Sequence, residues 1–124
     1  MRNIYNKLDQ SIQKQLDNLD AIHHFAHSRS KIDPTMVSQI ELDKFPPVIH
    51  PMVKINPVNN KKAVYFGSHT KSIKNLDGDE SSKLLKYLND FINNEDYIYS
   101  HKWDDFDLII WDNRSMLHLS LIHI

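Results

Sequence analysis

The sequence contains no cysteine and only two glycines in 124 residues. Without cysteine the chain has no disulfide framework, no thiolate ligands for zinc or an iron–sulfur cluster, and no thiol nucleophile. Gly67 and Gly78 are too far apart for the clustered glycines of a dinucleotide-binding GxGxxG loop or a Walker A phosphate loop. These absences exclude several large classes of nucleotide-binding and thiol-dependent proteins.

The chain also has no large excess of either positive or negative charge. It contains 15 Lys+Arg and 16 Asp+Glu, which gives a formal net charge of -1. A nucleic-acid-binding chain would carry a basic stripe, so we expect no nucleic-acid partner. No run approaches the ~18 apolar residues of a membrane span, and the N-terminus lacks the apolar core of a signal peptide. We therefore expect a soluble, cytoplasmic protein without a membrane partner, of a length that suits one small domain.

The hydrophobic period changes along the first half of the chain. Apolar residues spaced by three and four predict one long helix or two short ones at the start: Leu8, Ile12, Leu16, Leu19 and Ile22. Residues 28–47 carry serine, Asp-Pro and Pro-Pro signals and are expected to form a long loop. Strand-type residues at 48–55 and 63–66 flank a turn at 57–60, which predicts a β-hairpin.

The second half predicts a helix followed by strands. The helix covers residues 80–92, with Asp79 as its N-cap and one apolar face. Alternation predicts a strand over residues 97–103, and the apolar run 108–111 predicts a strand buried on both faces. Strands after a long helix indicate an α+β chain that is part of a β-sandwich or jelly roll.

Histidines are the first candidates for chemistry, and there are eight: His23, His24, His27, His50, His69, His101, His118 and His123. On one helix His23 and His27 would face the same way and could share a metal, which makes a small zinc-binding module one alternative. The competing interpretation is that both hydrogen-bond locally at the end of a helix. His50 precedes a proline and is expected to be structural.

His118 stands in a more informative context. An apolar run ends at Trp111, a polar turn follows at residues 112–114, and His118 comes four residues after that turn. Together with segments upstream, this order resembles the TauD/TfdA family of Fe(II)- and 2-oxoglutarate-dependent dioxygenases. The upstream segments are 21–25, similar to a helix end, 49–53 with Asn56-Pro57, 62–66, 80–88 and 99–103.

The resemblance implies roles for five residues. His118 would be the second histidine of the Fe(II) site, at which 2-oxoglutarate and O2 also bind. Asp112, Asn113 and Arg114 would hold the segment that presents His118, with a surface ion pair in the turn as the alternative role of Arg114. His69 would lie in a loop that borders a small anionic substrate.

Two parts of the family's pattern are missing. No histidine is followed two residues later by Asp or Glu, and the chain ends before the arginine that would anchor 2-oxoglutarate. The resemblance therefore implies an incomplete double-stranded β-helix (jelly roll) with flanking helices over residues 1–118, inactive alone. Its parent could be a homo-oligomer. The alternative is a truncated, non-catalytic paralogue that acts as an interaction protein through an uncovered sheet edge.

Residues 119–124 depart from this resemblance. Their sequence, Leu-Ser-Leu-Ile-His-Ile, is the translation of a common transposase sequencing adapter, CTGTCTCTTATACACATC. We therefore expect a non-native tail from adapter read-through, in which His123 has no functional role. Any other codons for these residues would contradict this expectation.

Overall fold

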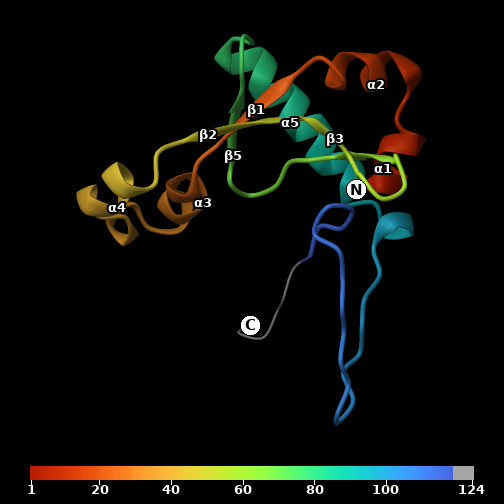
Figure 1. Cartoon of the computed structure of the whole chain (residues 1–124). Coiled ribbons are helices and arrows are strands. Elements are labelled where there is room, and N and C mark those ends of the chain that lie inside the picture. The colour runs from red at the N-terminus through yellow and green to blue at the C-terminus, as the bar shows by residue number, and fades with distance from the viewer. Residues whose placement is uncertain (119–124) are drawn as a thin grey trace.

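A computed structural model describes residues 1–118 (Figure 1). Two short helices open the chain, a strand and two further helices follow, and four strands then precede the longest helix. The elements are α1 (Arg2–Lys7), α2 (Gln10–Leu16), β1 (Asp20–His23), α3 (Phe25–Ile32), η1 (Pro34–Met36), α4 (Gln39–Lys44), β2 (Val48–Pro51), β3 (Val53–Ile55), β4 (Lys62–Val64), β5 (Thr70–Ile73), α5 (Gly78–Ile92) and η2 (Glu95–Tyr97). The chain is α+β, as expected.

The strands form two small antiparallel sheets. The first has the order β2-β1-β5, and the second is the β3-β4 hairpin. In the first sheet Ala21 of β1 lies opposite His50 of β2 and Ile73 of β5. Ala21 is fully buried, so this face of the sheet is the one directed into the protein.

The core lies between the sheets and α5. Its largest fully buried side chains are Leu16, Met52, Val64, Ile73 and Leu88. Leu84 and Leu88 form the buried stripe of α5, and the buried hydroxyl of Ser81 accepts a hydrogen bond of 2.8 Å from the backbone N–H of Ile73. This bond joins α5 to β5 directly.

The expected helix over 80–92 is confirmed, but its N-cap is two residues earlier. Asp77 caps α5, because its carboxylate accepts the Glu80 N–H at 2.7 Å. Asp79 instead lies in the first helical turn, where its charge complements the positive end of the helix. The hairpin is also confirmed, with Val53 opposite Val64.

Two expectations for the first half are wrong. Residues 20–23 form the central strand of the first sheet, whereas both the apolar spacing and the resemblance of 21–25 predicted helix. Pairing on both sides overrides the local pattern here. The expected loop at 28–47 contains the last part of α3 and all of α4, and α4 is stabilised by a capping box between Ser38 and Glu41.

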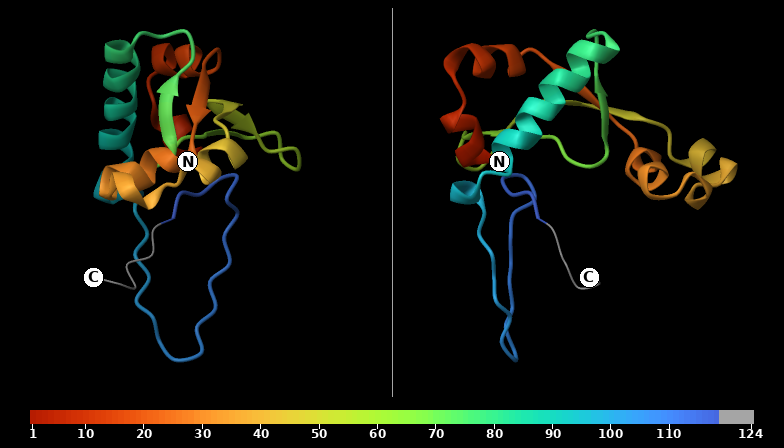
Figure 2. Two further views of the ribbon diagram at one scale, coloured as in Figure 1. Left: turned by 90° about the vertical axis from the view of Figure 1, so that its left-hand side faces the viewer. Right: turned by 180° about the vertical axis from the view of Figure 1, so that it is seen from behind.

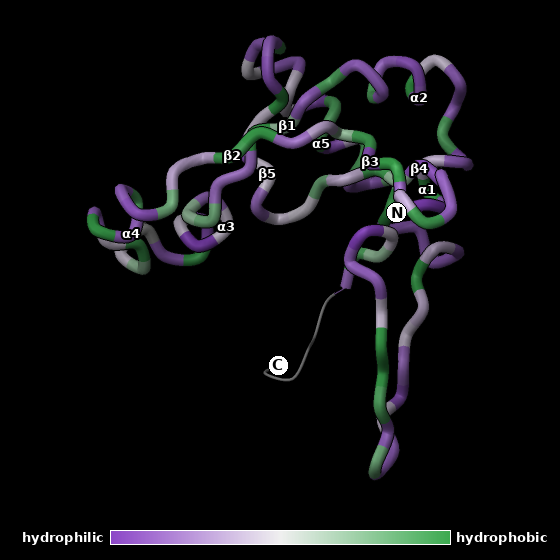
Figure 3. Tube along the Cα trace, viewed as in Figure 1, coloured by the Kyte–Doolittle hydropathy of each residue, from purple (hydrophilic) through white to green (hydrophobic). Residues whose placement is uncertain are grey.

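The strands expected at 97–103 and 108–111 are not formed. In the described chain no strand follows β5, and residues 98–111 form an extended arm that hangs away from the helices and sheets (Figures 1 and 2). Apolar residues lie along this arm (Figure 3), and Leu108 and Ile110 are 82% and 85% exposed. A strand needs a neighbour for its backbone hydrogen bonds, and residues 1–118 supply none at the arm.

After the arm the chain returns to the N-terminus, at the start of α1. The terminal amine of Met1 donates a hydrogen bond of 3.0 Å to the carbonyl of Ser115. Of the helices between residues 1 and 118, none is both long and apolar enough to cross a membrane.

Candidate functional site

A groove of about 430 Å³ lies where the first sheet meets the α3–α4 segment. Its walls are rich in rings and carry no carboxylate. The lining residues are His23, His24, Phe25, Lys44, Phe45, Pro46, Val48, His50, Tyr65 and His69. The groove therefore combines an apolar surface with imidazole and ammonium groups.

Strand register places two of these histidines on one face of the sheet. Ala21 lies opposite His50, and His23 lies opposite Val48. Because alternate residues of a strand share a face, His23 and His50 point to the side on which Ala21 is buried. The face that forms the core thus continues outward as the floor of the groove.

The floor is a cluster of three rings. The ring centroid of His23 is 5.6 Å from that of His50 and 5.3 Å from that of Tyr65, and His50 lies 5.5 Å from Tyr65. The ammonium of Lys54 sits 3.5 Å from the centroid of the Tyr65 ring, a cation–π contact. These contacts fix the orientation of both imidazoles.

His23 has one satisfied and one unsatisfied ring nitrogen. Its Nδ1 lies 3.3 Å from the hydroxyl of Thr70, which also accepts a hydrogen bond from the Gly67 N–H at 3.0 Å. Since that hydroxyl proton is available for Nδ1, we assign the ring proton to Nε2. Nε2 is buried and has no hydrogen-bond partner among the described residues.

Burial is the main cause that lowers the pKa of His23, and the positive charges of His50, Lys54 and His69 add to it. A pKa below the usual ~6.5 for histidine means that the ring is neutral at pH 7. The His23 side chain is therefore an uncharged donor held in an environment that disfavours its protonation.

His69 lines the groove from the loop before β5. Its Nδ1 lies 2.9 Å from the Ser28 hydroxyl, and its carbonyl accepts the His24 N–H at 2.9 Å. His69 thereby joins this loop to the start of α3. Contact of His69 with a substrate remains a prediction.

His27 lies elsewhere, in a second hollow of about 280 Å³ beside Lys71 and Leu42. His23 is on β1 and His27 is on α3, so the alternative in which both histidines share one helix face is wrong. Among residues 1–118, no group of three or more His, Asp or Glu side chains is placed so that it could hold a metal ion.

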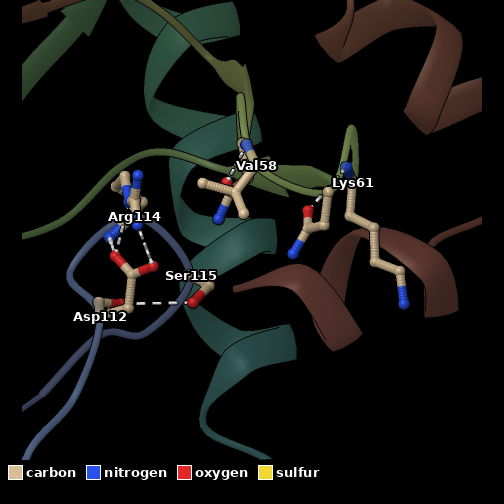
Figure 4. A network of polar contacts seen from close by, with 7 residues as sticks. Val58, Lys61, Asp112, Arg114 and Ser115 are labelled. Atoms are coloured by element: carbon tan, nitrogen blue, oxygen red, sulfur yellow. Dashed lines mark hydrogen bonds and ion pairs between the residues drawn. The ribbon is translucent and has the colours of Figure 1, made fainter.

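The turn before His118 is held by its own side chains. Arg114 makes a two-pronged ion pair with Asp112, with Nε–Oδ1 and Nη2–Oδ2 distances of 2.9 Å (Figure 4). This pair lowers the pKa of Asp112. Asn113 accepts a hydrogen bond of 2.8 Å from the indole of Trp111, against which the His118 ring packs at 4.6 Å.

These contacts match the ion-pair alternative for Arg114. An iron site of the two-histidine, one-carboxylate kind needs three ligands on one face. His118 is exposed, and the described chain brings no second ligand to it. The residues present therefore do not make an iron centre by themselves.

Solved structures that resemble this fold define its class. A protein from Burkholderia xenovorans, assigned as an alpha-ketoglutarate dependent 2,4-D dioxygenase, has a TM-score of 0.87 and 30% identity, over 93% of this chain and 45% of that one. AAD-2, solved with Mn(II) and N-oxalylglycine, has a TM-score of 0.77 and 30% identity, over 84% of this chain and 41% of its own. The class is that of the 2-oxoglutarate-dependent dioxygenases.

Within this class, residues 1–120 match the family described as "Taurine catabolism dioxygenase TauD, TfdA family", and the chain belongs to it. It is 31% identical to the alpha-ketoglutarate-dependent 2,4-dichlorophenoxyacetate dioxygenase of Cupriavidus pinatubonensis, over 95% of this chain and 41% of that protein. It is 34% identical to the (S)-phenoxypropionate/alpha-ketoglutarate-dioxygenase of Sphingobium herbicidovorans, over 95% and 43%. The chain thus spans about two-fifths of these relatives.

Proposed function

We propose that this chain is part of an Fe(II)- and 2-oxoglutarate-dependent dioxygenase that hydroxylates a small anionic organic substrate. In that reaction one atom of O2 enters the substrate as a hydroxyl group. The other enters succinate, as 2-oxoglutarate loses CO2. The observation that supports the proposal is the family match along almost the whole chain, against relatives of which the chain spans about two-fifths.

His118 is the residue of this chain that we propose as an iron ligand. The ion-paired Asp112–Arg114 turn and the Trp111 ring would set the position of the segment that carries it. The two other protein ligands and an arginine for 2-oxoglutarate would come from parts of the longer protein. Bound iron would supply the O2-activating chemistry, while this chain's groove residues would hold and orient the substrate.

The same proposal accounts for the arm. We propose that residues 98–111 become strands of the partial jelly roll when the rest of the domain lies beside them. The pattern that predicted strands at 97–103 and 108–111 would then be correct for the whole domain. The isolated chain is expected to be inactive, because one ligand does not give iron the geometry or affinity of three.

The test compares this chain with the longer protein recovered from the flanking coding DNA. Both are assayed for succinate release with Fe(II), 2-oxoglutarate and phenoxyacetate. We expect release by the longer protein, its loss in His118→Ala, and its retention in Lys61→Ala, a control that changes an exposed side chain between β3 and β4. Iron-dependent succinate release by the 124-residue chain alone would contradict the proposal.

A further inference from the structure

We propose that the arm tip of one copy of this chain, residues 103–107, docks into the groove of a second copy. The Phe106 ring would lie against the aromatic rings of the groove wall, and the aspartates of the arm tip would lie beside Lys44. The proposal goes beyond the proposed function and does not rest on it, because this chain carries both surfaces.

The arm tip holds a large apolar side chain in water. Phe106 is fully exposed, and its φ is 70°, a conformation that a bulky residue rarely adopts because it is strained. The turn around it is ordered by its own contacts. The carboxylate of Asp107 accepts the backbone N–H of Asp104 at 3.0 Å and lies 2.9 Å from Nε2 of His101. An ordered turn therefore presents a phenyl ring outward, in a position from which it can insert into another surface.

The arm tip and the groove have complementary charge. Residues 103–107 contain three aspartates and no lysine or arginine, and Asp104 and Asp105 are exposed. The groove has the exposed ammonium of Lys44 in its wall, together with four histidines and no carboxylate. An acidic segment is thus attracted to the groove and meets no like charge in its lining.

The apolar part of the groove suits the Phe106 ring. Phe25 and Phe45 meet edge to face at 5.4 Å, and Phe45 is 49% exposed. Val48, half exposed, continues this surface along β2. A third ring placed here would find aromatic neighbours in the arrangements that aromatic pairs prefer. Hollows of roughly 300–1,000 Å³ bury drug-sized ligands, so about 430 Å³ has room for a phenyl ring and an adjacent carboxylate.

The position of the arm makes a second copy the source of the occupant. The groove lies beside α3 and α4 at one end of the molecule, and the arm hangs from the other end, beyond η2 (Figures 1 and 2). An arm tip therefore does not reach the groove of its own chain. Docking between two copies joins two unlike surfaces, which is a heterologous contact.

Sedimentation equilibrium of the full 124-residue chain at about pH 7, over about 5–500 µM, tests for this association in the range of weak contacts. The average mass should rise above that of one chain as the concentration increases. The affinity should be at least about threefold lower in about 500 mM than in about 50 mM salt, because salt screens the exposed charges. The mass of one chain at every concentration, or equal affinity at both salt concentrations, would overturn the proposal.

Two variants identify the surfaces that meet. Phe106→Asp removes the ring of the arm tip, and Lys44→Glu with Val48→Glu places acidic groups in the groove. Each variant alone should keep the mass of one chain. An equimolar mixture should form pairs and stop at two chains, since the intact arm of the groove variant can enter the intact groove of the arm variant. If the groove variant loses its fold by circular dichroism, Lys44→Glu alone replaces it with the same expectation.

Other modes of association give other results. Contact between two arms would let the groove variant associate alone, and contact between two grooves would let the arm variant do so. Either result would contradict the assignment. Lys83→Glu makes the same charge change on the exposed side of α5 and should associate as the parent chain does. Loss of association in this control would contradict a specific role for Lys44.

Failure of this proposal differs from failure of the proposed function. A short chain that stays single would overturn the docking of the arm tip, and succinate release by the longer protein would still test the dioxygenase assignment. Association of the short chain without succinate release by the longer protein would support the docking and contradict that assignment.

Discussion

Ser81 contributes to stability out of proportion to its size, because its buried hydroxyl is the acceptor for the N–H of Ile73. Ser81→Ala leaves that donor unsatisfied inside the protein and should lower the free energy of unfolding by about 1–3 kcal/mol. Urea denaturation followed by circular dichroism measures the change. Ser82→Ala, one residue along on the exposed side of α5, is the control. Equal effects of the two variants would contradict this role.

Asp17 links stability to pH. Hydrogen bonds from Lys62, at 2.6 Å, and from Tyr5 lower its pKa in the folded protein. Because the pKa of Asp17 is lower in the folded than in the unfolded protein, the ionised carboxylate stabilises the fold above the unfolded pKa of about 4. This stabilisation is lost as the pH falls below that value and through the folded pKa. Lys62→Met should therefore flatten the fall in melting temperature below about pH 4. The exposed Lys61→Met should leave that fall unchanged, and the same acid profile in both variants would contradict the linkage.

At the level of elements, the structure and the sequence pattern assign different residues as the N-cap of α5. Asp77 caps the helix in the structure, whereas the pattern indicated Asp79. Asp77→Ala should destabilise the chain by about 1 kcal/mol, and Asp79→Ala by a few tenths, because Asp79 acts only through the helix dipole. Thermal unfolding of both variants measures the two effects. A larger loss of stability in Asp79→Ala than in Asp77→Ala would contradict the assignment of Asp77 as the N-cap.

Local patterns were sufficient for some elements and not for others. The helix α5 and the β3-β4 hairpin were predicted because amphipathic period and turn residues act over a few neighbours in sequence. β1 was missed because its strand conformation comes from pairing with β2 and β5, which are distant in sequence. The capping signal Ser38-x-x-Glu41 was present and would have indicated α4.

The site was predicted to a similar extent. Motif order led to His118 as an iron ligand and to His69 as a residue beside the substrate, and both roles stay predictions. The cluster of His23, His50 and Tyr65 does not follow from motif order, because three segments far apart in sequence meet there. His50 was assigned a structural role, and only the register of β1 against β2 shows that it shares a face with His23. The expected tail at 119–124 lies outside the described residues.

For the whole molecule, the arm is the part whose environment would change most in a longer protein. Leu108 and Ile110 are almost fully exposed here, so Leu108→Lys with Ile110→Lys should change the stability of this chain by less than about 0.5 kcal/mol. In the longer dioxygenase the same pair would place two charges in a buried strand and prevent folding. Urea denaturation of the short chain and soluble expression of the long one measure the two effects.

A large loss of stability in the short chain would show that the arm is already buried. Normal folding of the long variant would show that the arm stays exposed in the complete domain. Either result would contradict the assignment of residues 98–111 to the jelly roll.

The most direct measurement is the sequence of the coding DNA on both sides of residues 1–118. If the chain is part of a TauD/TfdA dioxygenase, one reading frame must encode a His-x-Asp or His-x-Glu pair upstream of Met1. It must also encode an arginine downstream of His118. A natural start codon at Met1 with a natural stop after Ile124, and no iron ligands encoded on either side, would contradict the account.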